Sequence, residues 1–527
     1  MLQVEYETWL AELRSKATGL IRSIAHCEPE IAASFISRKM LYLLEQHGNG
    51  EPRDHLDVTT NRLTSSSEAV IQFEGISSPM EYILQGLPPW TVKLGNANDR
   101  RSEQICISVR ASLSQLAGSI VSWDPAEVYL KLRRASLLGS LKYVWVYDST
   151  TLPVGVDALL CYLSARDDWT STSSNSFGAG EETLSTKVIS LRKKSGTCLV
   201  SVSKKVPRLL VPWLAQLSDR ARQILGSDTL LPPSRMHLFE FLSCVASAVE
   251  DPNVRSSFIA DVLSQSLEVL ESNDVKDALG SEENFMKSLG ILEAGIDPSS
   301  VTNAQHVRTI TNNFAKLYSA FNQLLCVGRR CHEGATKRPS GGIPLQDVSL
   351  DNNSNSEGNG SSYEHFPDEG TVSIIDLAVN DPFVPLWPRI IPPLLQALEC
   401  ILRIWHPEYQ ARILSNKVQR FIYAISDEDV FTVMKHDSLA SGGVFGEGGT
   451  AGTVVSGWDR RSLNLVPRWS GWFNELLNCC FQLLGLMAVQ RVLFAPEVAS
   501  MFPTLVSIVS NKKNLMSMEH RQMLQYL

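Results

Sequence analysis

The sequence has few of the features that secretion, membrane insertion or a disulfide framework require. Ten cysteines are scattered over 527 residues, mostly inside apolar runs, so we expect a reducing compartment, cytosol or nucleus. Residues 1–17 carry three glutamates where a secretory signal would be apolar. The most apolar later run, Cys479–Val489, is shorter than the roughly 20 residues that cross a bilayer. We therefore expect no membrane insertion.

Motifs for catalysis, metal binding and nucleotide binding are also missing. The glycine-rich run at 442–452 lacks the Gly-Lys-Ser/Thr ending of a phosphate-binding loop. Cys326, Cys331 and His332 have no second ligand pair at zinc-like spacing. We expect no catalytic residues, no cofactor, no metal site and a protein that is not an enzyme.

What the chain does contain is a composition typical of a folded protein, with 44% hydrophobic and 20% charged residues. Its length predicts two or more domains or a repeat array. The formal net charge of −8 argues against a surface that binds nucleic acid everywhere. A local basic patch remains compatible with that charge.

Amphipathic helical runs separated by proline-marked turns recur along the chain. After Pro392 and Pro393, which lack amide donors and therefore predict a helix start, apolar residues follow at helical spacing up to Trp405. His406-Pro407 predicts the end of that helix. We predict helices over residues 5–24, 29–46, 68–85, 103–121, 125–147, 153–164, 182–203, 207–225, 233–249, 252–271, 302–327, 393–405, 408–425, 468–493 and 496–510.

These runs predict an all-α fold, an α-solenoid superhelix of HEAT-like helical hairpin repeats. Pro207 and Pro252 both open helical runs and lie 45 residues apart, which matches the period of about 40–47 residues in such repeats. We expect repeats over 1–333, a disordered acidic, Ser-, Asn- and Gly-rich insertion over 334–371, and further repeats over 372–527. A mobile loop is expected at 437–459 and a shorter insertion at 167–182.

The segment Thr183–Leu214 is basic along one side. Lys193 and Lys204 are eleven residues apart, close to three helical turns, so they align if the helix is unbroken. A stripe of this kind can hold phosphates, although an ordinary solvated helix face gives the same pattern. The candidate RNA- or partner-binding residues are Arg192, Lys193, Lys194, Lys204, Lys205 and Arg208.

The basic segment resembles the inner helix of a HEAT repeat in the importin-β (karyopherin) superfamily. Over nearly the whole chain, the sequence resembles the middle and carboxyl-terminal part of the exportin-five type, in the form of the plant HASTY exportins. The similarity is extended rather than carried by a short motif. The stretches that show it lie at 188–212, 235–270, 381–405 and 493–506.

This resemblance implies a superhelix of HEAT repeats that exports double-stranded or hairpin small RNA, such as microRNA or its precursor. It implies Ran in its GTP form and nuclear pore proteins as partners, and shuttling between nucleus and cytoplasm. In that family RNA lies against a basic inner surface, in agreement with the recognition of duplex RNA mainly by shape and phosphates. A HEAT-repeat scaffold that binds only protein partners is the alternative.

The resemblance further implies a Ran-binding arch ahead of the repeats that Met1 opens. We therefore expect an incomplete Ran site and a chain that is not transport-competent alone. We also expect an apolar flank at Trp9, Leu10 and Leu13 that lowers solubility, because repeat arrays need polar caps.

Overall fold

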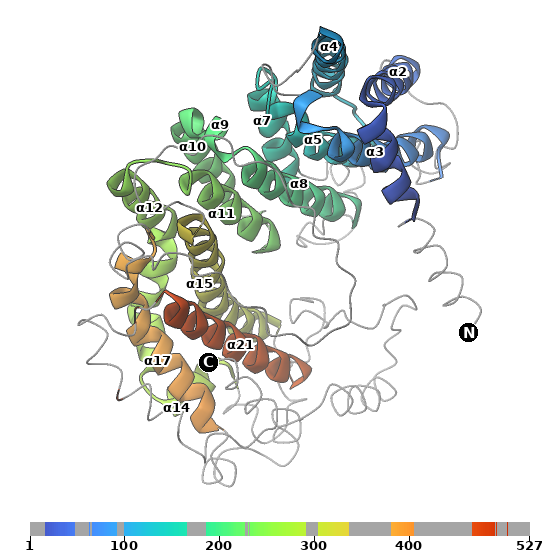
Figure 1. Cartoon of the computed structure of the whole chain (residues 1–527). Coiled ribbons are helices and arrows are strands. Elements are labelled where there is room, and N and C mark those ends of the chain that lie inside the picture. The colour runs from blue at the N-terminus through green and yellow to red at the C-terminus, as the bar shows by residue number, and fades with distance from the viewer. Residues whose placement is uncertain are drawn as a thin grey trace, which may run out of the picture. The chain divides into compact units, whose positions relative to one another are not determined.

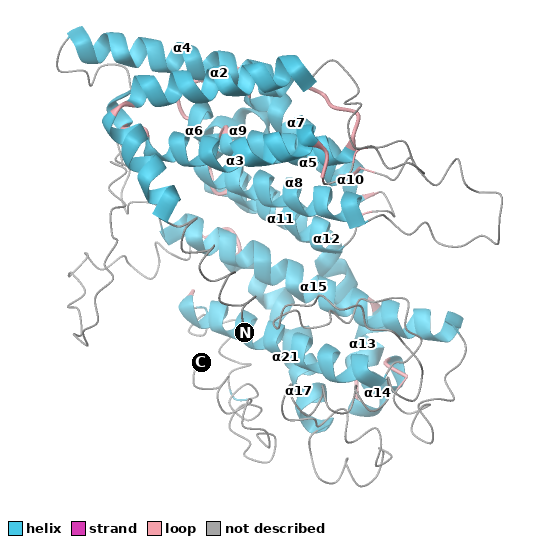
Figure 2. Ribbon diagram, turned by 90° about the vertical axis from the view of Figure 1, so that its right-hand side faces the viewer, coloured by secondary structure: helices cyan, strands magenta, loops and turns pink. Residues whose placement is uncertain are grey.

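The computed structural model describes twelve stretches of the chain, and all regular structure in them is helical (Figure 2). No strand occurs among these residues, so the predicted all-α fold is confirmed. They form two compact units, one containing the described residues up to Val249 and the other those from Glu250 onward. The described residues are 16–47, 63, 66–91, 100–165, 186–226, 230, 232–290, 304–336, 381–404, 466–490, 492 and 503.

The first unit is built from helical hairpins in two layers (Figure 1). Hairpin partners are α2 with α3, α4 with α5, α7 with α8, and α10 with α11. Helices α3, α5, α8 and α11 lie side by side and form one layer, called here the second-helix layer. The helices of the first unit have the bounds α2 (Pro29–His47), α3 (Glu68–Gly86), η1 (Pro89–Thr91), α4 (Arg100–Ser122), α5 (Val128–Ser140), α6 (Lys142–Trp145), α7 (Leu152–Leu163), α8 (Thr186–Lys205), α9 (Pro207–Leu210), η2 (Val211–Trp213), α10 (Leu214–Leu225) and α11 (Pro232–Ala246).

The second unit also consists of packed helices. Helix α12 contacts α15 and α17, and α21 packs against both α15 and α17. The short helices α13 and α14 contact α17. The bounds are α12 (Pro252–Glu271), α13 (Asn273–Leu279), α14 (Glu282–Ser288), α15 (Ala304–Thr336), η4 (Val384–Leu386), α17 (Trp387–Ile404) and α21 (Val466–Val489).

Local sequence signals explain where several helices begin. At α12 the Asp251 carboxylate accepts hydrogen bonds from the backbone N–H groups of Asn253 and Val254, and Pro252 occupies the first turn. This combination of an N-cap acid and an N1 proline gives the predicted range 252–271. Ser272 and Ser281 cap α13 and α14 in the same way. The sequence reading missed those two short helices.

The predicted start of α17 at residue 393 is wrong. The helix begins at Trp387 and contains Pro392 and Pro393 in its interior. Trp387, Ile390 and Ile391 are almost completely buried, so packing holds this turn in helical form although the prolines cannot donate hydrogen bonds. Tertiary burial has overridden the local proline signal.

Helix α15 is longer than predicted and continues to Thr336 rather than ending at 327. Val327, Cys331 and Ala335 recur every four residues and are all buried, so the apolar face extends through the predicted end. The predicted insertions at 167–182 and 437–459, the helices at 408–425 and nearly all of 496–510, and residues 337–371 lie outside the described residues. The predicted start of the insertion at residue 334 is wrong, because α15 continues through Thr336. The rest of the predicted insertion remains a prediction.

Helix α4 is the one described helix long and apolar enough to cross a membrane by length and composition alone. Core helices of folded domains share this property, which makes it weak evidence for a span. Here α4 packs against α2 and α5. Val109, Leu113 and Leu116 on α4 are fully buried.

Candidate nucleic-acid interface

Helix α8 occupies the middle of the second-helix layer, with α5 on one side and α11 on the other. Glycines permit close approach on both sides. A Cβ added at Gly139 of α5 would lie 2.5 Å from Cys198 Sγ, and one at Gly196 of α8 would lie 2.4 Å from His237 Cδ2. Because a larger residue would force these helices apart, the position of α8 is tightly determined.

Neighbouring helices of this layer run parallel, which places their side chains in register. Arg133 of α5 reaches Glu74 of α3 at 2.6 Å. Lys142 of α6 reaches Glu81 of α3 at 3.2 Å and Ser201 of α8 at 2.9 Å. The offset between contacting residues is 59–61, longer than the predicted repeat period. The result is a set of polar contacts that links four helices, α3, α5, α6 and α8.

Five cations form what we call the basic stripe: Lys193, Lys194, Lys204, Lys205 and Arg208. Helix α8 is unbroken over Thr186–Lys205, so Lys193 and Lys204 do align on one side of it. Arg208 follows in α9. Four of the five side chains are exposed, and Lys205 is half-buried. The stripe therefore presents a concentrated positive charge to solvent.

The basic stripe has no carboxylate partners within the described part of the chain. None of its five cations forms an ion pair there. Neighbouring cations of the same layer differ, since Arg133 is paired with Glu74 and Lys142 with Glu81. Lys193 and Lys204 align on one side of α8, and Lys194 and Lys205 lie about 100° further round the helix. Unneutralised cations gathered in this way provide the electrostatic surface that attracts a polyanion.

Arg192 does not belong to this surface, and its inclusion among the predicted site residues is wrong. Its side chain is only 1% exposed. The guanidinium Nε donates to the Ala165 carbonyl at 2.8 Å, and Nη2 donates to the same oxygen. Ala165 lies just beyond the end of α7, so Arg192 satisfies a helix-end carbonyl.

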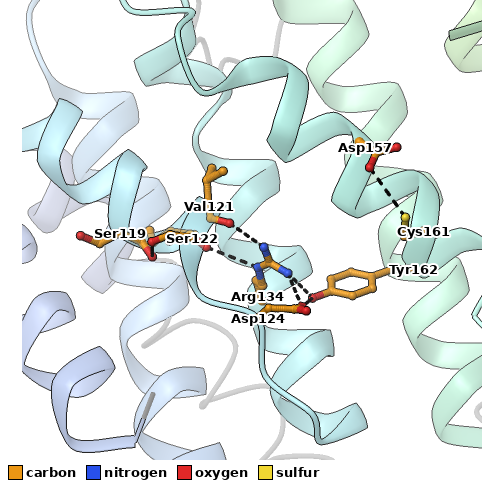
Figure 3. Close-up of polar contacts among 9 residues, drawn as sticks. Ser119, Val121, Ser122, Asp124, Arg134, Asp157, Cys161 and Tyr162 are labelled. Carbon is orange, nitrogen blue, oxygen red and sulfur yellow. Dashed lines mark hydrogen bonds and ion pairs between the residues drawn. The ribbon is translucent and has the colours of Figure 1, made fainter. Parts of the chain in front are cut away.

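Arg134 performs the same task one hairpin earlier (Figure 3). From α5, its Nε donates to the Ile120 carbonyl at 3.3 Å and Nη2 donates to the Val121 carbonyl at 2.6 Å, both at the end of α4. Its Nη1 contacts the Asp124 carboxylate at 2.8 Å and the Tyr162 hydroxyl at 2.6 Å. Arg134 and Arg192 are structural cations, distinct from the stripe.

Aromatic rings lie next to two lysines at the edge of α8 that faces α5 and α6. The Lys187 ammonium is 4.8 Å from the centre of the Tyr129 ring, and the Lys205 ammonium is 5.4 Å from the centre of the Tyr143 ring. Burial lowers the pKa of Lys205, and the nearby Lys142 charge lowers it further. The sequence reading missed both tyrosines, because they lie more than 50 residues before their lysines.

The surroundings of the stripe offer binding rather than covalent chemistry. Burial raises the pKa of the Cys198 thiol to about 11, so it is a poor nucleophile. No group of three His, Cys, Asp or Glu side chains among the described residues could hold a metal ion. The arrangement fits the recognition of phosphates by charge.

Comparison with known proteins identifies the family of the chain. The model of the Exportin-5 family matches residues 2–527, a range that includes every described helix. A search of curated proteins found no match.

Proposed function

Because the chain belongs to the Exportin-5 family, whose members are nuclear export receptors and not enzymes, we propose that it takes part in carrying small structured RNA from nucleus to cytoplasm. The cargo class is duplex or hairpin RNA such as microRNA or its precursor. Within the family, the sequence resemblance favours the HASTY type of plants.

One observation carries the RNA part of this proposal. The basic stripe holds five cations without carboxylate partners among the described residues, and four of them lie on a helix that the glycine contacts hold in place. Duplex RNA offers shape and phosphates rather than readable base edges, so such a surface suits its backbone. Binding through phosphates releases counterions and is therefore strongly salt-dependent.

Ran in its GTP form is the proposed partner. Directional export needs a cargo affinity that differs between the two compartments. That difference is a coupling free energy between the RNA site and a Ran site. The proposed receptor shuttles between nucleus and cytoplasm and contacts nuclear pore proteins on the way.

A protein-only scaffold is the second candidate, and exposed apolar side chains on α2 favour it. Ile31 is 63% exposed, Phe35 55% and Tyr42 48%. Apolar side chains gathered on one exposed helix are a common feature of protein interfaces. The apolar side chains of α2 and the basic stripe lie in different parts of the first unit. A measurement of RNA binding therefore decides between an RNA receptor and a protein-only scaffold.

The test is the affinity of the purified chain for a short RNA hairpin, measured by fluorescence anisotropy between 50 and 200 mM salt (about the range over which phosphate contacts weaken). We expect affinity to fall steeply with salt. The absence of RNA binding would favour the protein-only scaffold. Measurements with Ran-GTP and Ran-GDP then test coupling. Equal RNA affinities fit the incomplete Ran site expected from the sequence resemblance, whereas tighter RNA binding with Ran-GTP would show a working Ran site.

A further inference from the structure

Two lysines from different helices meet over one tyrosine ring at the carboxyl-terminal end of the basic stripe. The ammonium of Lys142 lies 5.0 Å from the centre of the Tyr143 ring, and that of Lys205 lies 5.4 Å from it. Lys142 and Tyr143 belong to α6, and Lys205 ends α8. Neither α6 residue was among the sequence-predicted site residues.

We propose that Lys142, Tyr143 and Lys205 form a phosphate-binding site for the RNA backbone, called here the seat. The carboxylate of Glu81 partly neutralises the positive charge of this seat. Lys205 contacts the phosphate. Lys142 and Tyr143 are positioning residues that bring a second positive charge and a ring to the same place. This inference rests on the proposed function and adds two residues of α6 to its site.

The ring explains how two ammonium groups can share this place. Like charges repel in proximity, but the negative face of an aromatic ring attracts each ammonium. Lys142 is fixed further by its contacts with Glu81 at 3.2 Å and Ser201 at 2.9 Å. The side chain of Lys142 is 13% exposed, while Lys205 is half-buried at the edge of solvent. A bound phosphate would relieve the repulsion between the two cations.

Glu81 is the part of the seat that makes the proposal testable by a gain of binding. It is the carboxylate that pairs with Lys142, and its side chain is 36% exposed. Through its ion pair with Lys142, Glu81 offsets part of the positive charge that a phosphate would meet at the seat. Removing that charge while keeping a hydrogen-bonding amide strengthens the local positive potential.

Helices α3 and α5 provide a matched control. Glu74 of α3 pairs with Arg133 of α5 at 2.6 Å, so Glu74→Gln removes an identical charge from the same helix. Arg133 is absent from the basic stripe and from the seat. Both variants change the net charge of the chain by the same amount.

The experiment compares RNA-hairpin affinity of Glu81→Gln and Glu74→Gln between 50 and 200 mM salt. Glu81→Gln is expected to raise affinity about threefold to tenfold at the low-salt end and to steepen the slope of log affinity against log salt by about one, as for one more phosphate contact. Glu74→Gln is expected to leave both unchanged. Equal effects of the two variants would overturn the seat and leave the proposed function standing.

Tyr143 separates positioning from general damage to the fold. Tyr143→Leu is expected to lower RNA affinity about threefold to tenfold because it removes the ring face. Tyr143→Phe keeps that face and is expected to restore affinity. If Phe and Leu weaken binding equally, while both variants keep the helical circular dichroism of the parent, the ring has no positioning role and the seat is overturned.

A final arm separates failure of the seat from failure of RNA binding as a whole. The acetylation rate of Lys205 relative to Lys204 is measured by mass spectrometry, with and without inorganic pyrophosphate. Selective protection of Lys205 is expected. If no variant binds RNA, the proposed function fails, and the seat is overturned as an RNA contact. Pyrophosphate protection would then show an anion site without RNA, and equal protection of both lysines would exclude even that.

Discussion

Cations serve opposite purposes on α8 of the first unit and on α17 of the second. In the second unit, Arg389 binds both oxygens of Glu271 at 2.6 and 2.8 Å, and Arg403 contacts both Glu282 and Glu399. The pairs of Arg389 with Glu271 and of Arg403 with Glu282 join α17 to α12 and α14. On α8 and at the start of α9, the five cations of the basic stripe have no ion-pair partner in the described part of the chain. The cations of α17 are neutralised by carboxylates of the same unit, whereas those of the basic stripe are not neutralised by described residues.

The difference shows which cations the fold uses for its own stability. Exposed ion pairs contribute roughly 0.2–1 kcal/mol each, and a bidentate arginine lies at the favourable end of that range. The lysines of the stripe contribute nothing comparable, and their mutual repulsion slightly opposes folding. The lysines of the stripe are therefore better explained by binding to a partner of opposite charge than by a contribution to folding.

The largest expected effect on stability comes from Arg192, a structural cation that lies next to the basic stripe in the sequence. Arg192→Met leaves the Ala165 carbonyl without its donors and is expected to destabilise the first unit by about 3 kcal/mol. Lys193→Met, one residue along, is expected to change stability by no more than about 0.5 kcal/mol. Urea unfolding followed by circular dichroism measures both. Similar losses for the two variants would abolish the distinction between structural and free cations.

A second prediction concerns how firmly the stripe is held. Gly196→Ala places a Cβ 2.4 Å from His237 Cδ2 and is expected to cost about 1–3 kcal/mol as α8 and α11 separate. RNA affinity should fall with it. Gly118→Ala in α4 is the control, since nothing lies within 4 Å of its added Cβ. It is expected to stabilise the chain by up to about 1 kcal/mol through helix propensity. Thermal unfolding that ranks the two variants in the reverse order would contradict this packing.

In the second unit, the carboxyl of Glu475 extends the comparison of paired and unpaired charges to an acidic side chain. Burial raises the pKa of Glu475, and its Oε2 has no hydrogen-bond partner among the residues that the structure describes. A raised folded-state pKa means that stability is greatest below the unfolded value of about 4.3 and is lost as the pH rises through the folded value. Glu475→Gln removes this loss and is expected to stabilise the unit by about 1 kcal/mol at pH 8. A gain that persists at pH 3 would have another cause.

The smallest expected effect belongs to a paired cation of α17. The hydrogen bond from Arg389 lowers the pKa of Glu271. The stability from this pair is therefore present above the unfolded pKa of about 4.3 and is lost as the pH falls through the lowered folded value. Arg389→Met is expected to cost about 0.5 kcal/mol at pH 7 and nothing at pH 2. RNA affinity should stay unchanged, and a marked fall would place α17 in the RNA interface.

Helical periodicity predicted much of this fold, including α12 over its full range. The same periodicity places Arg192 on the buried face of α8 and so removes it from the basic stripe. Val188, Arg192, Ser195 and Leu199 follow one another at three- and four-residue steps, and all four are buried. Neighbouring charges in the sequence suggested one patch, but the helical period separates Arg192 from Lys193 by about 100°.

The tertiary partners of the stripe were beyond the reach of sequence alone. Tyr143 and Lys142 meet α8 because α5, α6 and α8 lie side by side, with an offset that depends on the lengths of the intervening connections. The helical register of one segment does not fix that offset. The interior prolines of α17 give the same lesson, since burial of Trp387 decides the helix start against the local signal.

The most direct test of the account reverses two charges in each unit and follows RNA binding as salt is varied. Lys193→Glu with Lys204→Glu changes the stripe, while Lys276→Glu with Lys287→Glu makes the same change in net charge at exposed lysines of α13 and α14. The stripe variant is expected to lose at least about tenfold in affinity and to flatten the slope of log affinity against log salt by about two. The control is expected to keep the parent's slope. Equal losses and equal slopes would show that α8 carries an ordinary solvated face and that RNA binding, if present, lies elsewhere.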